Sequence, residues 1–153
     1  MSATQPTGAP AQRALAWGSV LVWVGIILVL SGDDFSAGTT SRFLGPFLQW
    51  LFPDLSPERF EAIHFAVRKG AHAFEYGVLA LLAQRAFRLD GVGEGWYGVA
   101  GAMALVSAIA GADELRQSLS MARTGARSDI ALDVAGGAAA LAIGAAFRRL
   151  RFW

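Results

Sequence analysis

The chain has 153 residues and no cysteine, and 13 basic and 12 acidic side chains give it a formal charge of +1. Charged residues make up 16% of the sequence, against roughly 25% in an ordinary soluble domain, and apolar residues make up 54%. This composition excludes a disordered chain, a disulfide scaffold and a metal centre built on cysteine. The near-zero charge also excludes a typical nucleic-acid-binding module. An all-α integral membrane protein is the class that remains.

The N-terminal sequence changes from a polar tail to a long apolar run. Residues 1–12 are small and polar and predict a disordered tail. Residues 14–32 carry no charge, enough to cross a hydrocarbon core of about 30 Å at roughly 1.5 Å per residue. A cleaved signal peptide, the alternative, would have a shorter apolar region that ends in a small-x-small site. Residues 35–38 fit such a site poorly, so we predict an uncleaved transmembrane helix.

A bulky apolar cluster lies in the next segment, residues 41–68. Its aromatic side chains suit the headgroup level of a bilayer, and Pro46 and Pro53 interrupt it. We therefore predict an amphipathic interfacial segment, with a loop helix packed on the bundle as the alternative. Ser56 and Pro57 are typical of a helix N-cap and first helical position, so a helix should begin there and run into the next span.

Three further spans complete a predicted bundle of four transmembrane helices. They are expected at about residues 70–88, 95–112 and 129–147, within one membrane domain at 13–153. The first and last of the three carry acids into the membrane. Arginines end the second span, and the acid-free segment RRLR lies at 148–151, near the C-terminus. By the positive-inside rule we expect both termini to face the cytoplasm.

Polar residues gather at the outer end of these spans. At 100° per residue, Lys69, His72 and Tyr76 share one arc of the second span. The third span ends with two acids and an amide, and the fourth begins with two acids four positions apart. The full set is Lys69, His72, Glu75, Tyr76, Asp113, Glu114, Gln117, Arg123, Asp129 and Asp133. We expect these residues to line one ligand-binding pocket.

Charges inside a membrane require partners, because one at mid-helix costs about 2.5–3.5 kcal/mol on insertion scales. Ion pairs that merely fasten the helices together are the alternative to a binding site. Small residues recur every fourth position at Gly136, Ala140 and Gly144 of the fourth span. They recur likewise from Ala100 to Ala112 of the third span. Such stripes favour close helix packing and should bring the acids of these two spans together.

Three stretches resemble the VanZ-like family: RKGAHAFEYGVLALL at 68–82, DELRQ at 113–117 and RTGARSDIALDVAGG at 123–137. The polar set above and Gly136 fall on the family's motif positions. The stretch SLSMA at 118–122 departs from the family's usual sequence before the arginine. The resemblance implies a bacterial multi-pass protein of the cell envelope, located in the cytoplasmic (inner) membrane. The family's namesake is linked to resistance against the antibiotic teicoplanin. It implies no particular reaction.

Two functions fit this polar set best. The first is binding of a lipid headgroup, a lipid-linked sugar or a lipoglycopeptide antibiotic, because arginine suits phosphate or carboxylate and acids suit hydroxyls or amines. The second is an intramembrane enzyme acting on a lipid phosphate or glycolipid. Its general acid or base would be drawn from His72, Glu75, Glu114 and Asp129. Transport is a third hypothesis, which the apolar inner half of the spans disfavours.

The enzyme hypothesis leaves room for a divalent metal. The candidate ligands are Asp113, Glu114, Asp129 and Asp133. Gly125, Asp129 and Asp133 also reproduce the end of the CDP-alcohol phosphotransferase signature. The head of that signature is absent, since position 111 is glycine. The metal therefore stays an open possibility.

Overall fold

The computed structural model describes residues 7–32, 37–92, 96–118 and 127–150. These ranges contain helices and no strand, which confirms the all-α class. The helices are α1, Pro10–Leu30; α2, Ala37–Leu51; α3, Pro57–Leu89; α4, Trp96–Ser118; and α5, Arg127–Leu150.

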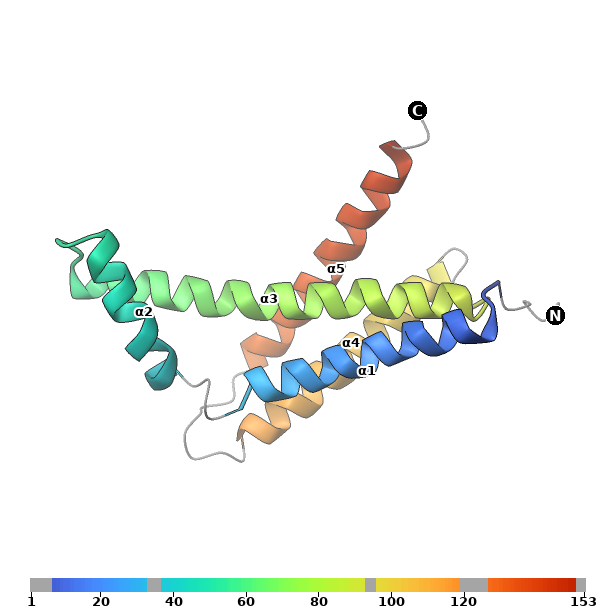
Figure 1. The fold of residues 1–153 in the computed structure, drawn as a ribbon, viewed down its shortest axis with the longest axis horizontal. Helices are drawn as coiled ribbons and strands as arrows, with labels where there is room; N and C mark the ends of the chain where they lie inside the picture. Colours follow the sequence, from blue (N-terminus) through green and yellow to red (C-terminus); the bar gives the residue numbers. More distant parts are fainter. Residues whose placement is uncertain (1–6, 33–36, 93–95, 119–126, 151–153) are drawn as a thin grey trace.

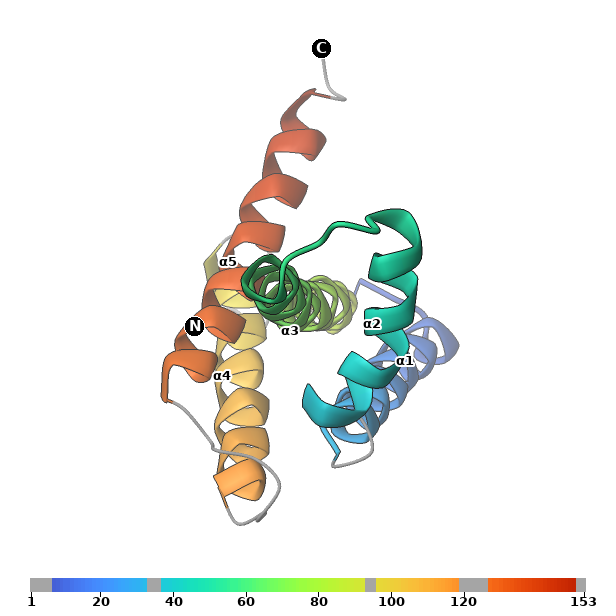
Figure 2. The same cartoon turned by 90° about the vertical axis from the view of Figure 1, so that its left-hand side faces the viewer.

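The longest helix, α3, is the centre of the fold. It packs against α1, α4 and α5, and α2 contacts it near its start. Figure 1 shows α1 and α4 alongside the C-terminal part of α3, with α5 crossing it steeply. Figure 2 looks along α3 and shows the other helices around it. The helix that carries the first motif is therefore enclosed by the other helices rather than placed at the edge.

Local sequence sets the start of α3, as predicted. Ser56 is the N-cap: its hydroxyl accepts a hydrogen bond from the backbone N–H of Arg59 at 3.4 Å, and Pro57 is the first helical residue. The helix then continues to Leu89. The predicted continuation of this helix through residues 70–88 is thus confirmed.

The start of α1 lies beside the end of α3. Residues 10–12, which we assigned to the tail, form the first turn of α1. The Thr7 hydroxyl donates to the carbonyl of Arg88 at 2.8 Å, and the Gly8 N–H donates to that of Leu89 at 3.0 Å. Residues 1–6 lie outside the described ranges. These bonds make α1 and α3 antiparallel neighbours.

Three helices are long and apolar enough to cross a membrane, namely α1, α4 and residues 128–150 of α5. They contain most of the predicted spans 14–32, 95–112 and 129–147. The predicted span 70–88 lies inside α3, which does not meet the same criterion because polar side chains interrupt its apolar run. Helix length and composition therefore support three of the four predicted spans.

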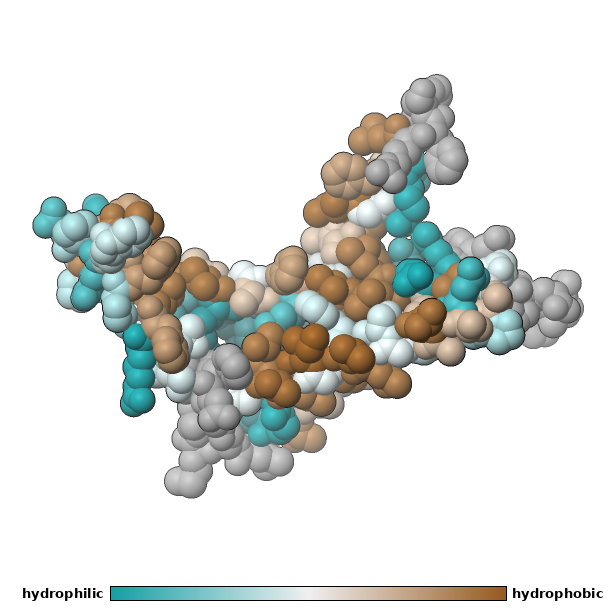
Figure 3. Space-filling view, viewed as in Figure 1, coloured by the Kyte–Doolittle hydropathy of each residue, from teal (hydrophilic) through white to brown (hydrophobic). Residues whose placement is uncertain are grey.

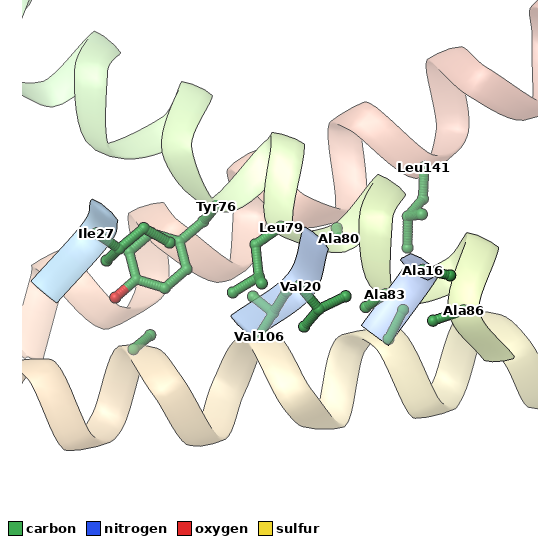
Figure 4. Close-up of a cluster of buried hydrophobic side chains, with 12 residues drawn as sticks. Ala16, Val20, Ile27, Tyr76, Leu79, Ala80, Ala83, Ala86, Val106 and Leu141 are labelled. Carbon is green, nitrogen blue, oxygen red and sulfur yellow. The ribbon is translucent and has the colours of Figure 1, made fainter. Parts of the chain in front are cut away.

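Buried apolar side chains from several helices form the core. Figure 4 shows Tyr76 of α3 beside Ile27 of α1, and Leu79 of α3 above Val106 of α4. Alanines dominate the rest of the cluster, so the helix backbones lie close together. The surface is the reverse, because large apolar side chains of α1 such as Leu21 and Val22 are exposed. Figure 3 shows this brown face over α1.

The alanine stripe predicted to join the third and fourth spans does not do so. Ala100, Ala104, Ala108 and Ala112 of α4 are all exposed. The buried small and apolar residues of that helix are instead Gly98, Ala102, Val106 and Ala110. This prediction was wrong because an alanine-rich helix has small residues on several faces, and spacing alone does not select one.

The stripe on α5 is a contact surface, but with α3 rather than with α4. A Cβ on Gly136 would lie 2.4 Å from the carbonyl oxygen of Ala73, and one on Gly77 would lie 3.2 Å from the Cβ of Ala140. The absence of side-chain atoms at Gly136 thus permits the closest approach of the two helices. It also determines which face of α5 meets the polar residues of α3.

The predicted interfacial segment contains α2 and the first turns of α3. α2 continues through Pro46, which we expected to interrupt it. Proline removes one helical N–H, and the carbonyl of Arg42 that it would have bonded belongs to an exposed residue. Phe43, Phe47 and Trp50 of α2 are exposed.

Candidate functional site

Asp113 forms the first polar cluster, between the ends of α1 and α4. Its side chain is buried and accepts hydrogen bonds from the Ser31 hydroxyl at 2.5 Å, from Arg116 at 3.1 Å and from the Gln117 amide at 2.8 Å. Arg116 also contacts Ser31 and donates to the carbonyl of Leu28 at 2.9 Å. Both carboxylate oxygens are therefore used, and the cluster joins the two helix ends.

Two ion pairs form the second polar cluster, between α3 and α5. Lys69 pairs with Asp129, and Nδ1 of His72 lies 3.4 Å from a carboxylate oxygen of Asp133. The acids are four residues apart and the bases three, so both pairs lie on facing sides of the helices. The Asp133 side chain is only 4% exposed. A buried carboxylate and imidazole thus lie next to a lysine–aspartate pair.

Tyr76 lies between the two clusters and is fully buried. The carboxylates of Asp113 and Asp133 both act electrostatically on its hydroxyl, as do those of Glu75 and Glu114. Among the described residues, the hydroxyl has no hydrogen-bond partner. Figure 4 shows its ring directed from α3 towards α4, with Ile27 beside it.

Three buried polar atoms of this region lack a hydrogen bond within the described part of the chain. They are the Tyr76 hydroxyl, Nδ1 of His72 and one carboxylate oxygen of Asp133; the last two are close but not aligned for a hydrogen bond. Buried polar atoms in stable proteins are nearly always hydrogen-bonded to protein or water. His72 and Asp133 still face each other as an ion pair, so the Tyr76 hydroxyl is the atom that a polar group entering the bundle would satisfy.

The remaining predicted site residues lie around these clusters. Glu114 and Gln117 are buried on the same face of α4 as Asp113. Glu75 is half-buried, and its backbone carbonyl accepts a hydrogen bond from the Trp23 indole of α1 at 2.8 Å. Arg123, which we expected in the same pocket, lies outside the described residues.

The described residues do not gather a metal site. The candidate ligands were Asp113, Glu114, Asp129 and Asp133, yet no three His, Asp or Glu side chains converge in the ranges that the structure covers. The physical reason is that Asp113 already accepts three hydrogen bonds and Asp129 is held by Lys69. Hydrogen-bond donors therefore occupy both oxygens of Asp113, and Lys69 contacts one oxygen of Asp129.

Sequence reasoning missed Ser31 and Trp23 of α1. Both bond to motif helices: Ser31 to Asp113 of α4, and Trp23 to the backbone of α3. Ser31 stood at the end of an otherwise apolar span, which was the available signal. His64 of α3, to which the sequence pattern assigns no role, is also buried and stacks on Phe60 with ring centroids 5.8 Å apart.

The motif residues of three separate stretches thus come together on α3, α4 and α5. Neither a curated protein nor a solved structure matches the chain. The profile of one protein family, VanZ/LLP1, matches residues 16–148. Because this match covers α1 to α5 almost completely, the chain belongs to the VanZ/LLP1 family.

Proposed function

We propose that this protein binds, at the outer leaflet of a bacterial membrane, a lipid headgroup, a lipid-linked sugar or a lipoglycopeptide antibiotic. The observation that carries the proposal is the buried Tyr76 hydroxyl, which has no hydrogen-bond partner among the described residues and lies in the field of the Asp133 carboxylate, itself paired with His72. Helices fastened only by ion pairs would not need a buried tyrosine hydroxyl surrounded by carboxylates. A ligand hydroxyl, amine or phosphate would supply the missing bonds.

The chemistry of the site suits a polar head on an apolar body. Hydroxyls and amines of a sugar would bond to Asp133 and Tyr76, and Lys69 could turn from Asp129 to a phosphate or carboxylate. Large exposed apolar side chains on α1 and α5 adjoin the membrane, where the lipid part of such a ligand would remain. The site thus matches amphiphilic molecules of the envelope better than it matches soluble ones.

The proposed location follows from a four-span topology in which α3 also crosses the membrane. α3 needs no lipid-compatible surface around its whole circumference, because α1, α4 and α5 pack on it. Its first turns and α2 would then lie at the outer interface, where the exposed rings of Phe43 and Trp50 meet headgroups. Both termini would face the cytoplasm.

Fusions to alkaline phosphatase are expected to show this orientation. The enzyme folds only outside the cytoplasm, so a fusion after Met121 should be active and one after Trp153 inactive. The arginines near the ends of α3 and α5 are the reason, through the positive-inside rule. Activity in the opposite pattern would place the polar clusters in the inner leaflet.

Exchanging the charges of Lys69 and Asp129 separates a binding site from a structural ion pair. The single variants Lys69→Asp and Asp129→Lys should lower the melting temperature, because each places two like charges together. The double variant restores an ion pair and should recover the melting temperature. We nevertheless expect it to bind teicoplanin and a lipid-linked disaccharide at least roughly thirtyfold more weakly, the loss expected when one partner of a buried charged contact is misplaced.

The matched control is Asp90→Asn, which alters an acid at the other end of the bundle and should leave binding unchanged. Full recovery of binding in the double variant would mean that the pair only fastens α3 to α5. Absence of binding by the native protein to both probes would overturn the proposal.

A second candidate function is catalysis on the same amphiphiles. The observation in its favour is the His72–Asp133 pair, since an imidazole held by a buried carboxylate is a common general base. The same reconstituted samples distinguish it, because an enzyme would change the mass of the added lipid or glycolipid. An unchanged mass with retained binding favours the first proposal.

A further inference from the structure

A second charged region lies at the opposite end of the bundle and plays no part in the proposed site. It consists of Arg85 and Arg88 near the end of α3 and Arg148 and Arg149 near the end of α5. Figure 3 shows hydrophilic surface from the C-terminal part of α5 to that of α3, in the open angle between the two helices. Four positive charges from two helices thus lie at this end of the bundle.

The geometry brings two of these guanidinium groups towards each other. Arg148 donates to the side-chain oxygen of Gln84 at 3.4 Å, and Gln84 is buried in α3. Arg88 lies one helical turn beyond Gln84 on the same side of α3. Arg88 and Arg148 interact electrostatically, with like charges. The fold therefore holds two cations together across a helix–helix contact.

No carboxylate in the described ranges pairs with these four arginines. Asp90, the acid beside them in the sequence, is turned towards α1. It accepts a hydrogen bond from the Trp17 indole at 2.7 Å and lies 3.9 Å from Arg13. The repulsion between Arg88 and Arg148 is thus not relieved by the acid next to them.

Helix dipoles explain part of this arrangement but not its convergence. An arginine in the last turn of a helix is stabilised by the partial negative charge there, by about 0.3–1 kcal/mol at exposed sites. That effect acts on α3 and α5 separately and requires no contact between them. Two guanidinium groups held side by side favour an anion between them, because each presents paired donors that match phosphate oxygens.

We infer that Arg88 and Arg148, with Arg85 and Arg149 at the rim, bind the phosphate of an anionic phospholipid. The apolar neighbours favour a lipid over a free phosphate. Ile143, Phe147 and Leu150 of α5 are exposed beside the arginines, and Leu81 of α3 lies against the α5 backbone at Gly144. Acyl chains would cover these side chains while the headgroup met the arginines.

The test uses the full chain purified and placed in bilayers of phosphatidylcholine alone or with phosphatidylglycerol. The native protein should melt at a higher temperature with phosphatidylglycerol. Each arginine near an anionic lipid contributes roughly a fivefold factor in affinity. Arg88→Gln with Arg148→Gln should therefore weaken binding of short-chain phosphatidylglycerol by about twenty- to thirtyfold and abolish the difference in melting temperature.

The single variant Arg88→Gln should affect the melting temperature differently in the two bilayers, which a purely structural role would not do. In phosphatidylcholine, Arg88→Gln should leave the melting temperature unchanged or raise it, because one of two like charges is removed. When phosphatidylglycerol is present, the same variant should lower the melting temperature. Loss of an arginine that only caps its helix would lower the melting temperature in both bilayers, and that result would overturn the inference.

Two further arms test specificity. Arg42→Gln with Arg59→Gln removes the same charge from exposed positions of α2 and α3 and should keep the phosphatidylglycerol response. If this control lost the phosphatidylglycerol response equally, the response would come from general surface charge, and the proposed site would be wrong. Inorganic phosphate should not reproduce the response; full stabilisation by phosphate alone would overturn the lipid as ligand. These outcomes are independent of ligand binding at the Lys69–Asp129 end.

Discussion

Gly136→Ala is expected to destabilise the protein by about 3 kcal/mol, near the upper part of the range for overpacked cores. The new methyl carbon would lie 2.4 Å from the carbonyl oxygen of Ala73 and 2.7 Å from its Cα. Those neighbours are backbone atoms of a central helix, so they cannot rotate away. α3 and α5 would have to separate, and that movement would also open the Lys69–Asp129 contact. Thermal unfolding of the purified protein in detergent measures the effect.

The chain offers matched control glycines for this experiment. A Cβ on Gly25 of α1 or Gly111 of α4 would meet no atom within 4 Å. Alanine at either position should be neutral, or stabilising by up to about 1 kcal/mol through helix propensity. If Gly136→Ala behaved like these two, the close approach of α3 and α5 would be incorrect.

Asp113→Ala should cost about 3 kcal/mol, because it removes the acceptor of several donors at once. The hydroxyl of Ser31 and the amide of Gln117 are buried, and both would lose their bond to this carboxylate. Arg116 would keep its bond to the carbonyl of Leu28 and its contact with water, which limits the loss. The end of α1 should then separate from α4.

Measuring the free energy of unfolding of Asp113→Asn beside that of the native protein and of Asp113→Ala refines this result. Asparagine keeps one oxygen and the shape of the side chain, so a smaller loss is expected than with alanine. Asp54→Ala, at an exposed acid before α3, serves as the control for charge alone and should be near neutral. Equal stability of Asp113→Ala and Asp54→Ala would contradict the proposed role of the α1–α4 cluster.

Much of the fold could be predicted because single segments encode it. The apolar runs gave α1, α4 and α5, and the Ser56–Pro57 pair gave the start of α3. The membership of the VanZ-like family was likewise readable from three motifs and is confirmed. Pro46 misled because a proline lowers helix propensity without forbidding a helix at the protein surface.

The partners of the site residues were harder to predict than the residues themselves. We expected the acids of the last two spans to meet each other, yet Asp129 and Asp133 face Lys69 and His72 of α3. The rotation of α5 decides this, and the rotation depends on the contact of Gly136 with the α3 backbone. A contact between residues so distant in sequence leaves no periodic signal in either helix.

The central place of α3 constrains the order in which the chain can assemble in a bilayer. α1 is apolar enough to insert as soon as it is made, whereas α3 carries charges that lipid alone does not accommodate. Its partners for those charges, Asp129 and Asp133, belong to α5, which is synthesised after α3. The polar face of α3 is therefore covered only once α5 has been made and has packed on it.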